Sequence, residues 1–176
     1  METKNHWYML TLVGEDQKGI VAHVTSALDE NGCNLGETSM LRLGGNFTIM
    51  MMVEYKGSKK SLHDAVSNVA ESMGLSLHID AIKAHLHQHR NADVRISVYG
   101  ADRAGIVAMV TNALYEVGLD IFDLESDVAG SKEEPLFVMH IEGHATEGVA
   151  AIEAALEIVR QKGVEASLST IDTMLG

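Results

Sequence analysis

The sequence contains a single cysteine, Cys33, and a single proline among its 176 residues. One cysteine cannot form an internal disulfide, so a fold held together by disulfides is excluded and a reducing compartment is favoured. We expect Cys33 to be a small, half-buried residue that follows a helix. Low-complexity stretches are absent too, and a hydrophobic content of 46% is typical of a packed globular chain.

Long hydrophobic runs and a leader sequence are also missing. Runs such as Ile49–Val53 have the length of a strand and are far too short to cross a bilayer. Residues 1–6 lack the basic and apolar regions of a signal peptide. We therefore expect a cytoplasmic protein.

Positive charge is scarce, and the formal net charge of −12 is spread unevenly. Residues 1–92 hold ten acidic and eight basic side chains, whereas residues 93–176 hold fifteen acidic and five basic ones. Such a surface repels phosphate backbones, and no basic patch with interleaved aromatic residues offsets it. The sequence therefore argues against direct binding of nucleic acid.

A repeat dominates what is present. The segment from Gly14 to Gly32 returns 86 residues later, from Gly100 to Gly118, with identical residues at Gly, Asp, Gly-Ile-Val-Ala, Val-Thr, Ala-Leu, Glu and Gly. Such a duplication predicts two domains of about eighty residues each. We place the first domain at residues 1–84, a linker at 85–92 and the second domain at 93–176.

Each copy predicts the same order of elements. In the first copy we expect strands at 7–13, 35–43, 46–55 and 75–82, a helix between Ile20 and a stop at Gly32, and a second helix at 61–73. Ser61 is the expected N-cap of that second helix, and Gly44-Gly45 suits a tight hairpin turn of the primed type. The second copy repeats the pattern. The order βαββαβ predicts an α+β fold of two ferredoxin-like domains, each a four-stranded antiparallel sheet with two helices on one face.

The third strand differs between the copies. In the first copy the alternate residues Met50 and Met52 make both faces apolar, whereas His140 and Glu142 make one face polar in the second. A strand that is apolar on both sides is expected to be covered on both sides. We infer that the helix-free face of the first sheet packs on the other copy or on a second chain, as in a homo-oligomer. Methionine as an adaptable surface residue is the alternative.

The repeated Gly-x-Asp-x-x-Gly-Ile-Val lies between the first strand and the first helix of each copy. Its amides open a helix, where they have no intrahelical acceptor and lie at the positive end of the helix dipole, an arrangement suited to anions. A nearby aspartate could hold an ammonium group, so that an amino acid would be bound at both ends. The alternative is structural: Asp16 and Asp102 cap the helices, and the glycines only form turns.

This turn, the repeated βαββαβ order and Asn34-Leu35 at the start of the second strand resemble ACT domains, which are small-molecule-sensing modules. Two such domains with little else, together with Met40-Leu-Arg-Leu-Gly-Gly-Asn-Phe-Thr-Ile-Met-Met-Met-Val53, resemble more narrowly the glycine cleavage system transcriptional repressor group. The resemblance covers about residues 6–84 and 93–173.

The resemblance implies where an effector would bind. In ACT domains an effector amino acid commonly lies where two domains meet, held by the turn after the first strand and by the first helix. The implicated ligand-binding residues are Asp16, Gly19, Ile20, Val21 and Asn34 in the first copy, and Asp102, Gly105, Ile106, Val107 and Asp120 in the second. The family often has proline before the glycine, where this chain has Lys18 and Ala104. Because Asp120 adds negative charge near a carboxylate site, the first copy is the better candidate.

Two further clusters have alternating polar residues. His85, His87 and His89 would share one face of an extended linker and could hold a metal, but no cysteine or carboxylate completes a set at local spacing. A polar linker is the favoured interpretation, and no metal or cofactor is predicted. The second cluster, Asp123, Glu125 and Asp127, lines one side of an expected strand. It either protects a sheet edge or forms a docking surface for a basic partner.

The favoured hypothesis is a non-catalytic regulator. It senses a small amino acid, with glycine suggested by the resemblance, and controls transcription indirectly through a protein partner such as a transcription factor. The alternatives are a protein-binding ACT scaffold without ligand sensing, and a small enzyme or regulatory subunit of an amino-acid-metabolism enzyme. No recognisable catalytic triad, zinc signature or P-loop is present in the sequence.

Overall fold

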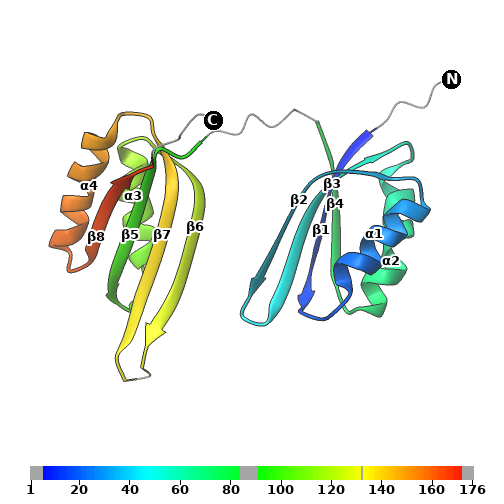
Figure 1. Ribbon diagram of the computed structural model, residues 1–176, viewed down its shortest axis with the longest axis horizontal. Helices are drawn as coiled ribbons and strands as arrows, with labels where there is room; N and C mark the ends of the chain where they lie inside the picture. The colour runs from blue at the N-terminus through cyan, green and yellow to red at the C-terminus, as the bar shows by residue number, and fades with distance from the viewer. Residues whose placement is uncertain (1–5, 84–90, 132, 172–176) are drawn as a thin grey trace. The chain divides into compact units, whose positions relative to one another are not determined.

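The computed structural model describes residues 6–83, 91–131 and 133–171. The chain divides into two compact units, Met1–Leu86 and His87–Gly176. Each unit has the order βαββαβ (Figure 1), which confirms the predicted fold class. The expected linker, with His85, His87 and His89, lies outside the described residues except for its last two positions.

The first unit is a four-stranded antiparallel sheet in the order β2-β3-β1-β4, with two helices. Its elements are β1 (His6–Glu15), α1 (Ile20–Glu30), β2 (Asn34–Leu43), β3 (Asn46–Tyr55), α2 (Lys59–Ser72) and β4 (Ser76–Ile82). The hairpin between β2 and β3 turns at Gly44 and Gly45, whose φ angles are 56° and 79°. Two positive φ angles match the predicted primed turn.

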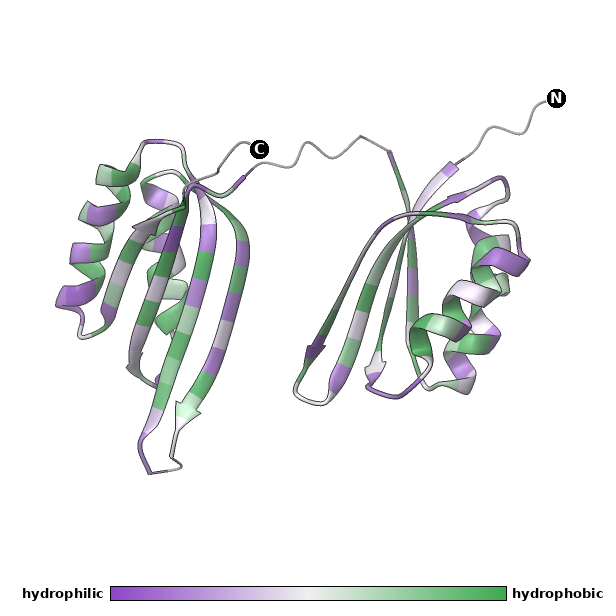
Figure 2. Ribbon diagram, in the orientation of Figure 1, coloured by the Kyte–Doolittle hydropathy of each residue, from purple (hydrophilic) through white to green (hydrophobic). Residues whose placement is uncertain are grey.

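The second unit repeats this topology with the strand order β6-β7-β5-β8. Its elements are β5 (Val94–Ala101), α3 (Ile106–Glu116), β6 (Leu119–Gly130), β7 (Pro135–Ala145), α4 (Val149–Gln161) and β8 (Glu165–Thr170). Purple and green bands alternate along the C-terminal half of β7 in Figure 2, where buried Ile141 lies between His140 and Glu142. This alternation places one face of the strand against the helices and leaves the other to water.

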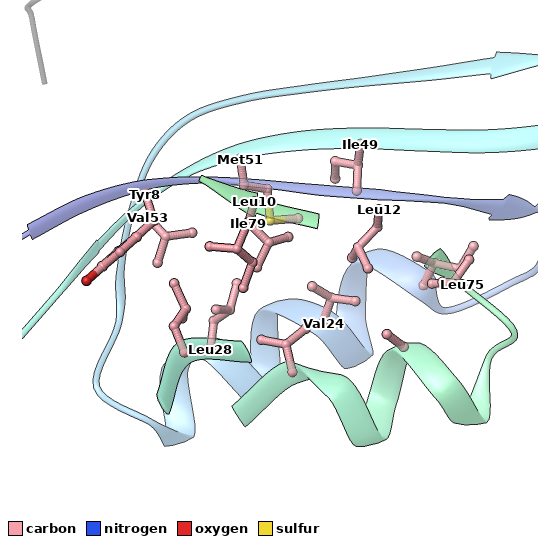
Figure 3. Packing of buried hydrophobic residues seen from close by; sticks show 14 of the residues in the cluster. Tyr8, Leu10, Leu12, Val24, Leu28, Ile49, Met51, Val53, Leu75 and Ile79 are labelled. Atoms are coloured by element: carbon pink, nitrogen blue, oxygen red, sulfur yellow. The ribbon is translucent and has the colours of Figure 1, made fainter. Parts of the chain in front are cut away.

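Each unit has its own hydrophobic core between its sheet and its helices. In the first unit, Leu10 and Leu12 of β1 and Met51 of β3 point toward Val24 and Leu28 of α1 (Figure 3), and all five side chains are fully buried. Apolar side chains recur at every second residue along the strands and about every 3.6 residues along the helix. Each element therefore presents one apolar face to the other, which explains the packing. Cys33, just after α1, packs half-buried against this core as expected.

The start of α2 differs from the prediction. Its N-cap is Ser58, whose hydroxyl oxygen accepts a hydrogen bond of 3.1 Å from the backbone N–H of Ser61. The prediction of Ser61 as N-cap is therefore wrong, because the helix begins at Lys59, two residues before Ser61. Because Lys59 and Lys60 are polar, the apolar periodicity does not mark this first turn of the helix.

The edge strands β2 and β6 each contain one register shift near their start. The pairing of β2 with β3 shifts between Leu35 and Thr38, and that of β6 with β7 between Ile121 and Asp123. One extra residue in a strand exchanges the faces to which all later side chains point. After its bulge, β2 places Arg42 on the helix side of the sheet, opposite buried Phe47.

No helix in the described part of the chain is long and apolar enough to cross a membrane.

Candidate functional site

The repeated turn has the same backbone in both units. Gly19 and Gly105 are the N-cap residues of α1 and α3, with φ angles of 89° and 87°. Glycine adopts this left-handed conformation without the steric cost that a side chain would add. Neither helix has a side-chain cap, so the alternative in which Asp16 and Asp102 cap the helices is wrong. The first amides of each helix are thus left without an intrahelical acceptor or an aspartate cap.

The turn is anchored on both sides by equivalent bonds. Gln17 Nε2 donates to the carbonyl of Met73, and Arg103 Nη2 donates to that of Lys162, both at 2.6 Å. The backbone N–H of Asp16 donates to Gly45 at 3.0 Å, and that of Asp102 to Pro135 at 3.4 Å. The turn is therefore fixed between the β-hairpin and the end of the second helix in each unit.

A hollow of ≈ 270 Å³ lies at the turn of the first unit. It is lined by Asp16, Gln17, Lys18, Gly19, Ile20, Val21, Ala22, Met40, Arg42 and Phe47. It brings together four of the five residues expected in this copy. Since a water molecule takes about 30 Å³, the hollow has room for roughly nine waters, which suits a small ligand.

The charged pair in this hollow joins the turn to β2. Arg42 Nε lies 3.2 Å from Asp16 Oδ2. The other carboxylate oxygen, Asp16 Oδ1, is buried and has no hydrogen-bond partner among the described residues. An unsatisfied buried acceptor costs about 1–3 kcal/mol, so its retention in a fold is unusual. This oxygen is the strongest sign of a binding function in the first unit.

Asn34 lies elsewhere. It follows the C-terminal end of α1, an 11-residue helix, so it is about 16 Å along the helix from the Gly19 turn. It lines a separate hollow of ≈ 460 Å³ with Thr25, Ser26, Asp29, Cys33 and Leu35. Its side-chain amide donates to Glu54 Oε2 at 3.4 Å. The unit therefore does not bring Asn34 together with Asp16.

The neighbouring thiol argues against nucleophilic chemistry in that second hollow. Burial raises the pKa of Cys33 above its usual value. A raised pKa lowers the thiolate fraction at neutral pH, and the thiolate is the nucleophilic form. Cys33 is thus a weaker nucleophile at neutral pH than an ordinary exposed thiol.

The turn of the second unit has a different lining. Its hollow of ≈ 380 Å³ contains Gly105 and Ile106 of the predicted set, together with Arg103, Ala104, Met109 and Lys162. Asp102 and Val107 do not line it. Asp120 is near the start of β6, opposite His144 and beyond the end of α3. The second unit therefore brings two of its five predicted residues into one hollow.

The registers of the two sheets identify the residue that corresponds to Arg42. In the first unit Gly14, Phe47 and Arg42 lie side by side across β1, β3 and β2. Gly100, Phe137 and Val128 hold the same places in the second unit. Valine thus stands where the first unit has its arginine, and the two turns differ in charge.

The acidic residues Asp123, Glu125 and Asp127 lie after the bulge of β6, and all three are exposed. They pair in register with Glu142, His140 and Val138, which alternate with the buried residues of β7. The acidic row therefore lies on the helix-free face of the second sheet.

Arg42 and Gln17 line the hollow but are not among the residues expected from the sequence. A two-residue turn at Gly44-Gly45 fixes the pairing of the residues that flank it. The predicted hairpin therefore already places Arg42 opposite Phe47. The pairing of Phe47 with Gly14, which brings Arg42 near Asp16, is a long-range contact that no local pattern reveals. In the described ranges, no group of three or more His, Cys, Asp or Glu side chains is placed to hold a metal ion.

Comparisons with known proteins point to one family. The ACT-domain family model matches residues 6–80. The UPF0237 protein YjhC of Lactococcus lactis is 39% identical over 83 residues, which span 46% of this chain and 95% of that protein. The glycine cleavage system transcriptional repressor of Escherichia coli is 22% identical over 156 residues, 88% of this chain and 82% of the repressor.

Two solved structures share the fold along almost the whole chain. One is a protein of unknown function from Galdieria sulphuraria, with a TM-score of 0.76 and 23% identity, covering 96% of this chain and 100% of that one. The other is a proposed glycine cleavage system transcriptional repressor, with a TM-score of 0.71 and 19% identity, covering 96% and 99%.

Proposed function

The chain belongs to the ACT-domain family and is related to the glycine cleavage system transcriptional repressor and the UPF0237 proteins, and from this premise we propose that it is a non-catalytic regulator that binds a small amino acid at the Gly19 turn. Glycine is the first effector to test, because of the relationship to that repressor. The regulator acts on transcription through a protein partner.

The observation that carries this proposal is the unpartnered Asp16 Oδ1 beside the start of α1. An ammonium group would supply the hydrogen bond that this oxygen lacks. The amides at the start of the helix would receive the carboxylate of the same ligand. An α-amino acid carries both groups on one carbon.

Calorimetric titration of the full chain with glycine, serine and alanine tests the sensing. We expect saturable binding of at least one of them, and an affinity at least about tenfold lower in Asp16→Asn, because hydrogen bonds to charged groups contribute about 1.5–3 kcal/mol. Asp102→Asn removes the same charge from the second turn and serves as the matched control. Absence of both heat and a thermal shift with all three amino acids would contradict the proposal and favour a scaffold without sensing.

The acidic row on the helix-free face of the second sheet is the proposed docking surface for the partner. The row combines with a surplus of ten negative charges in residues 93–176, which argues against nucleic acid as the direct target and favours a basic protein. The partner is thus a DNA-binding protein with a basic surface outside its DNA contacts.

Substitution of the row as Asp123→Asn, Glu125→Gln and Asp127→Asn tests the docking. Immobilised wild-type chain is expected to retain a DNA-binding protein from the native cell, with retention that changes when glycine is added, and the triple variant is expected to lose it. The matched control is Asp29→Asn with Glu30→Gln and Glu71→Gln, which removes three exposed charges from the helices of the first unit. Equal retention by both triple variants would contradict this docking surface.

A further inference from the structure

The two turns have the same backbone but differ at one charged position on the neighbouring strand. Asp16 has Arg42 beside it, whereas Val128 holds the corresponding position near Asp102. Building on the proposed function, we propose that Arg42 is the residue that determines specificity: it selects ligands with a free carboxylate next to an ammonium group and confines amino acid binding to the first unit.

The ion pair leaves binding capacity on both of its partners. Arg42 uses Nε toward Asp16 Oδ2, and its two terminal nitrogens form no hydrogen bond with the described residues. A guanidinium has five N–H donors in a planar fork that matches a carboxylate. On the acid, Oδ1 is the oxygen without a partner.

The unpartnered acceptor on Asp16 and the unused donors on Arg42 are complementary to the two charged groups of an α-amino acid. The pair offers an acceptor and a set of donors side by side in one hollow, and the ligand offers an ammonium and a carboxylate on one carbon. Asp16 then receives the ammonium at Oδ1, and Arg42 shares the carboxylate with the first amides of α1. Arg42 is 65% exposed, so its fork can turn into the hollow without loss of core packing.

The second unit lacks this complementarity. Val128 cannot donate to a carboxylate, and the side chain of Arg103 is directed to the carbonyl of Lys162. Asp102 does not line the hollow at that turn, so none of the residues that line it offers a carboxylate to an ammonium. One amino acid per chain is therefore the expected stoichiometry.

The test separates the two charged groups of the ligand. Calorimetric titrations of the full chain use glycine, serine, their amides, which lack the carboxylate charge, and acetate, which lacks the ammonium. We expect one site per chain for the amino acids, and affinities at least about tenfold lower for the amides and acetate.

Arg42→Gln supplies the decisive comparison. It is expected to weaken binding of the amino acids at least about tenfold more than it changes binding of the amides, because the lost ion pair with Asp16 affects both kinds of ligand and the lost carboxylate contact affects only the acids. Arg42→Lys keeps the charge without the planar fork and should give an intermediate affinity. Arg95→Gln removes the same charge from β5 and should match the wild type, and thermal unfolding of each variant checks that the fold is retained.

The outcomes distinguish this inference from the proposed function. Wild-type binding that Arg42→Gln leaves unchanged, or that it weakens equally for acids and amides, would overturn the role of Arg42 alone. Two equivalent sites per chain would also overturn it. A wild-type chain that binds none of the amino acids would overturn the proposed function itself.

Discussion

At the scale of single residues, the first glycine of the repeated motif has a different role in each copy. A Cβ at Gly14 would lie 2.6 Å from Leu75 Cδ2, 3.1 Å from the Gly74 carbonyl oxygen and 3.3 Å from Leu75 Cα. A Cβ at Gly100 would meet nothing closer than 3.7 Å, which is ordinary van der Waals contact. Sequence identity between the copies therefore conceals a steric requirement that only one copy has.

This difference predicts unequal effects of the same substitution. Gly14→Ala should destabilise the first unit by about 1–3 kcal/mol, because the methyl group must displace the buried side chain of Leu75 and crowds the backbone between α2 and β4. Gly100→Ala should change stability by less than about 0.5 kcal/mol. Urea unfolding followed by circular dichroism measures both, and an equal loss in the two variants would contradict the steric argument.

At the scale of elements, the two second helices begin differently. Ser58 caps α2 through its hydroxyl oxygen, whereas α4 has Gly148 as its N-cap residue and no side-chain cap. The hydroxyl of Ser61 donates to the carbonyl of Ser58 at 2.9 Å, so the two serines bond to each other's backbone across the first turn. Only the bond from the Ser61 amide to the Ser58 hydroxyl satisfies a backbone N–H that the helix itself leaves unpaired.

Substitution of each serine tests this assignment. Ser58→Ala should lower the free energy of unfolding of the first unit by about 1 kcal/mol, the usual contribution of an N-cap. Ser61→Ala should cost less than about 0.5 kcal/mol, since it removes an exposed side-chain donor. Trp7 is the single tryptophan and lies on β1, so its fluorescence during urea unfolding reports on the first unit. A larger loss of unfolding free energy in Ser61→Ala than in Ser58→Ala would contradict the assignment of Ser58 as the N-cap.

Element order and the hairpin between β2 and β3 could be predicted from sequence, because each rests on a local signal. An apolar run of strand length marked β3, and the glycine pair marked its turn. The candidate site was harder. Gly19 could be found from the repeat, but the separation of Asn34 from Asp16 depends on the length of α1, and the approach of Arg42 to Asp16 depends on the long-range pairing of Phe47 with Gly14, which no sequence pattern announced.

At the scale of the whole molecule, the chain holds two complete cores with no residue in common. Each has four strands and two helices to cover them, which suffices for independent folding of a small domain. The extra negative charge of the second half lies on a unit that does not depend on the first for its core.

We therefore expect residues 1–86 and 87–176, expressed separately, each to unfold cooperatively. The sum of their circular dichroism spectra should reproduce the spectrum of the full chain. Within the full chain, Gly14→Ala should lower the midpoint seen by Trp7 fluorescence and leave the transition of the second unit in place. A half that stays unfolded alone would show that its stability depends on the other half.

The bulges in β2 and β6 determine which side chains of each strand lie on which face of its sheet. Without the extra residue in β2, the Gly44-Gly45 turn would still pair Arg42 with Phe47, and Asn34 and Leu35 at the start of the strand would point to the opposite faces. Without the one in β6, Asp123, Glu125 and Asp127 would face the helices in place of Leu124, Ser126 and Val128. A single extra residue in each edge strand thus separates two registers along that strand, and a one-residue deletion at the bulge would turn the side chains on one side of it to the opposite face of the sheet.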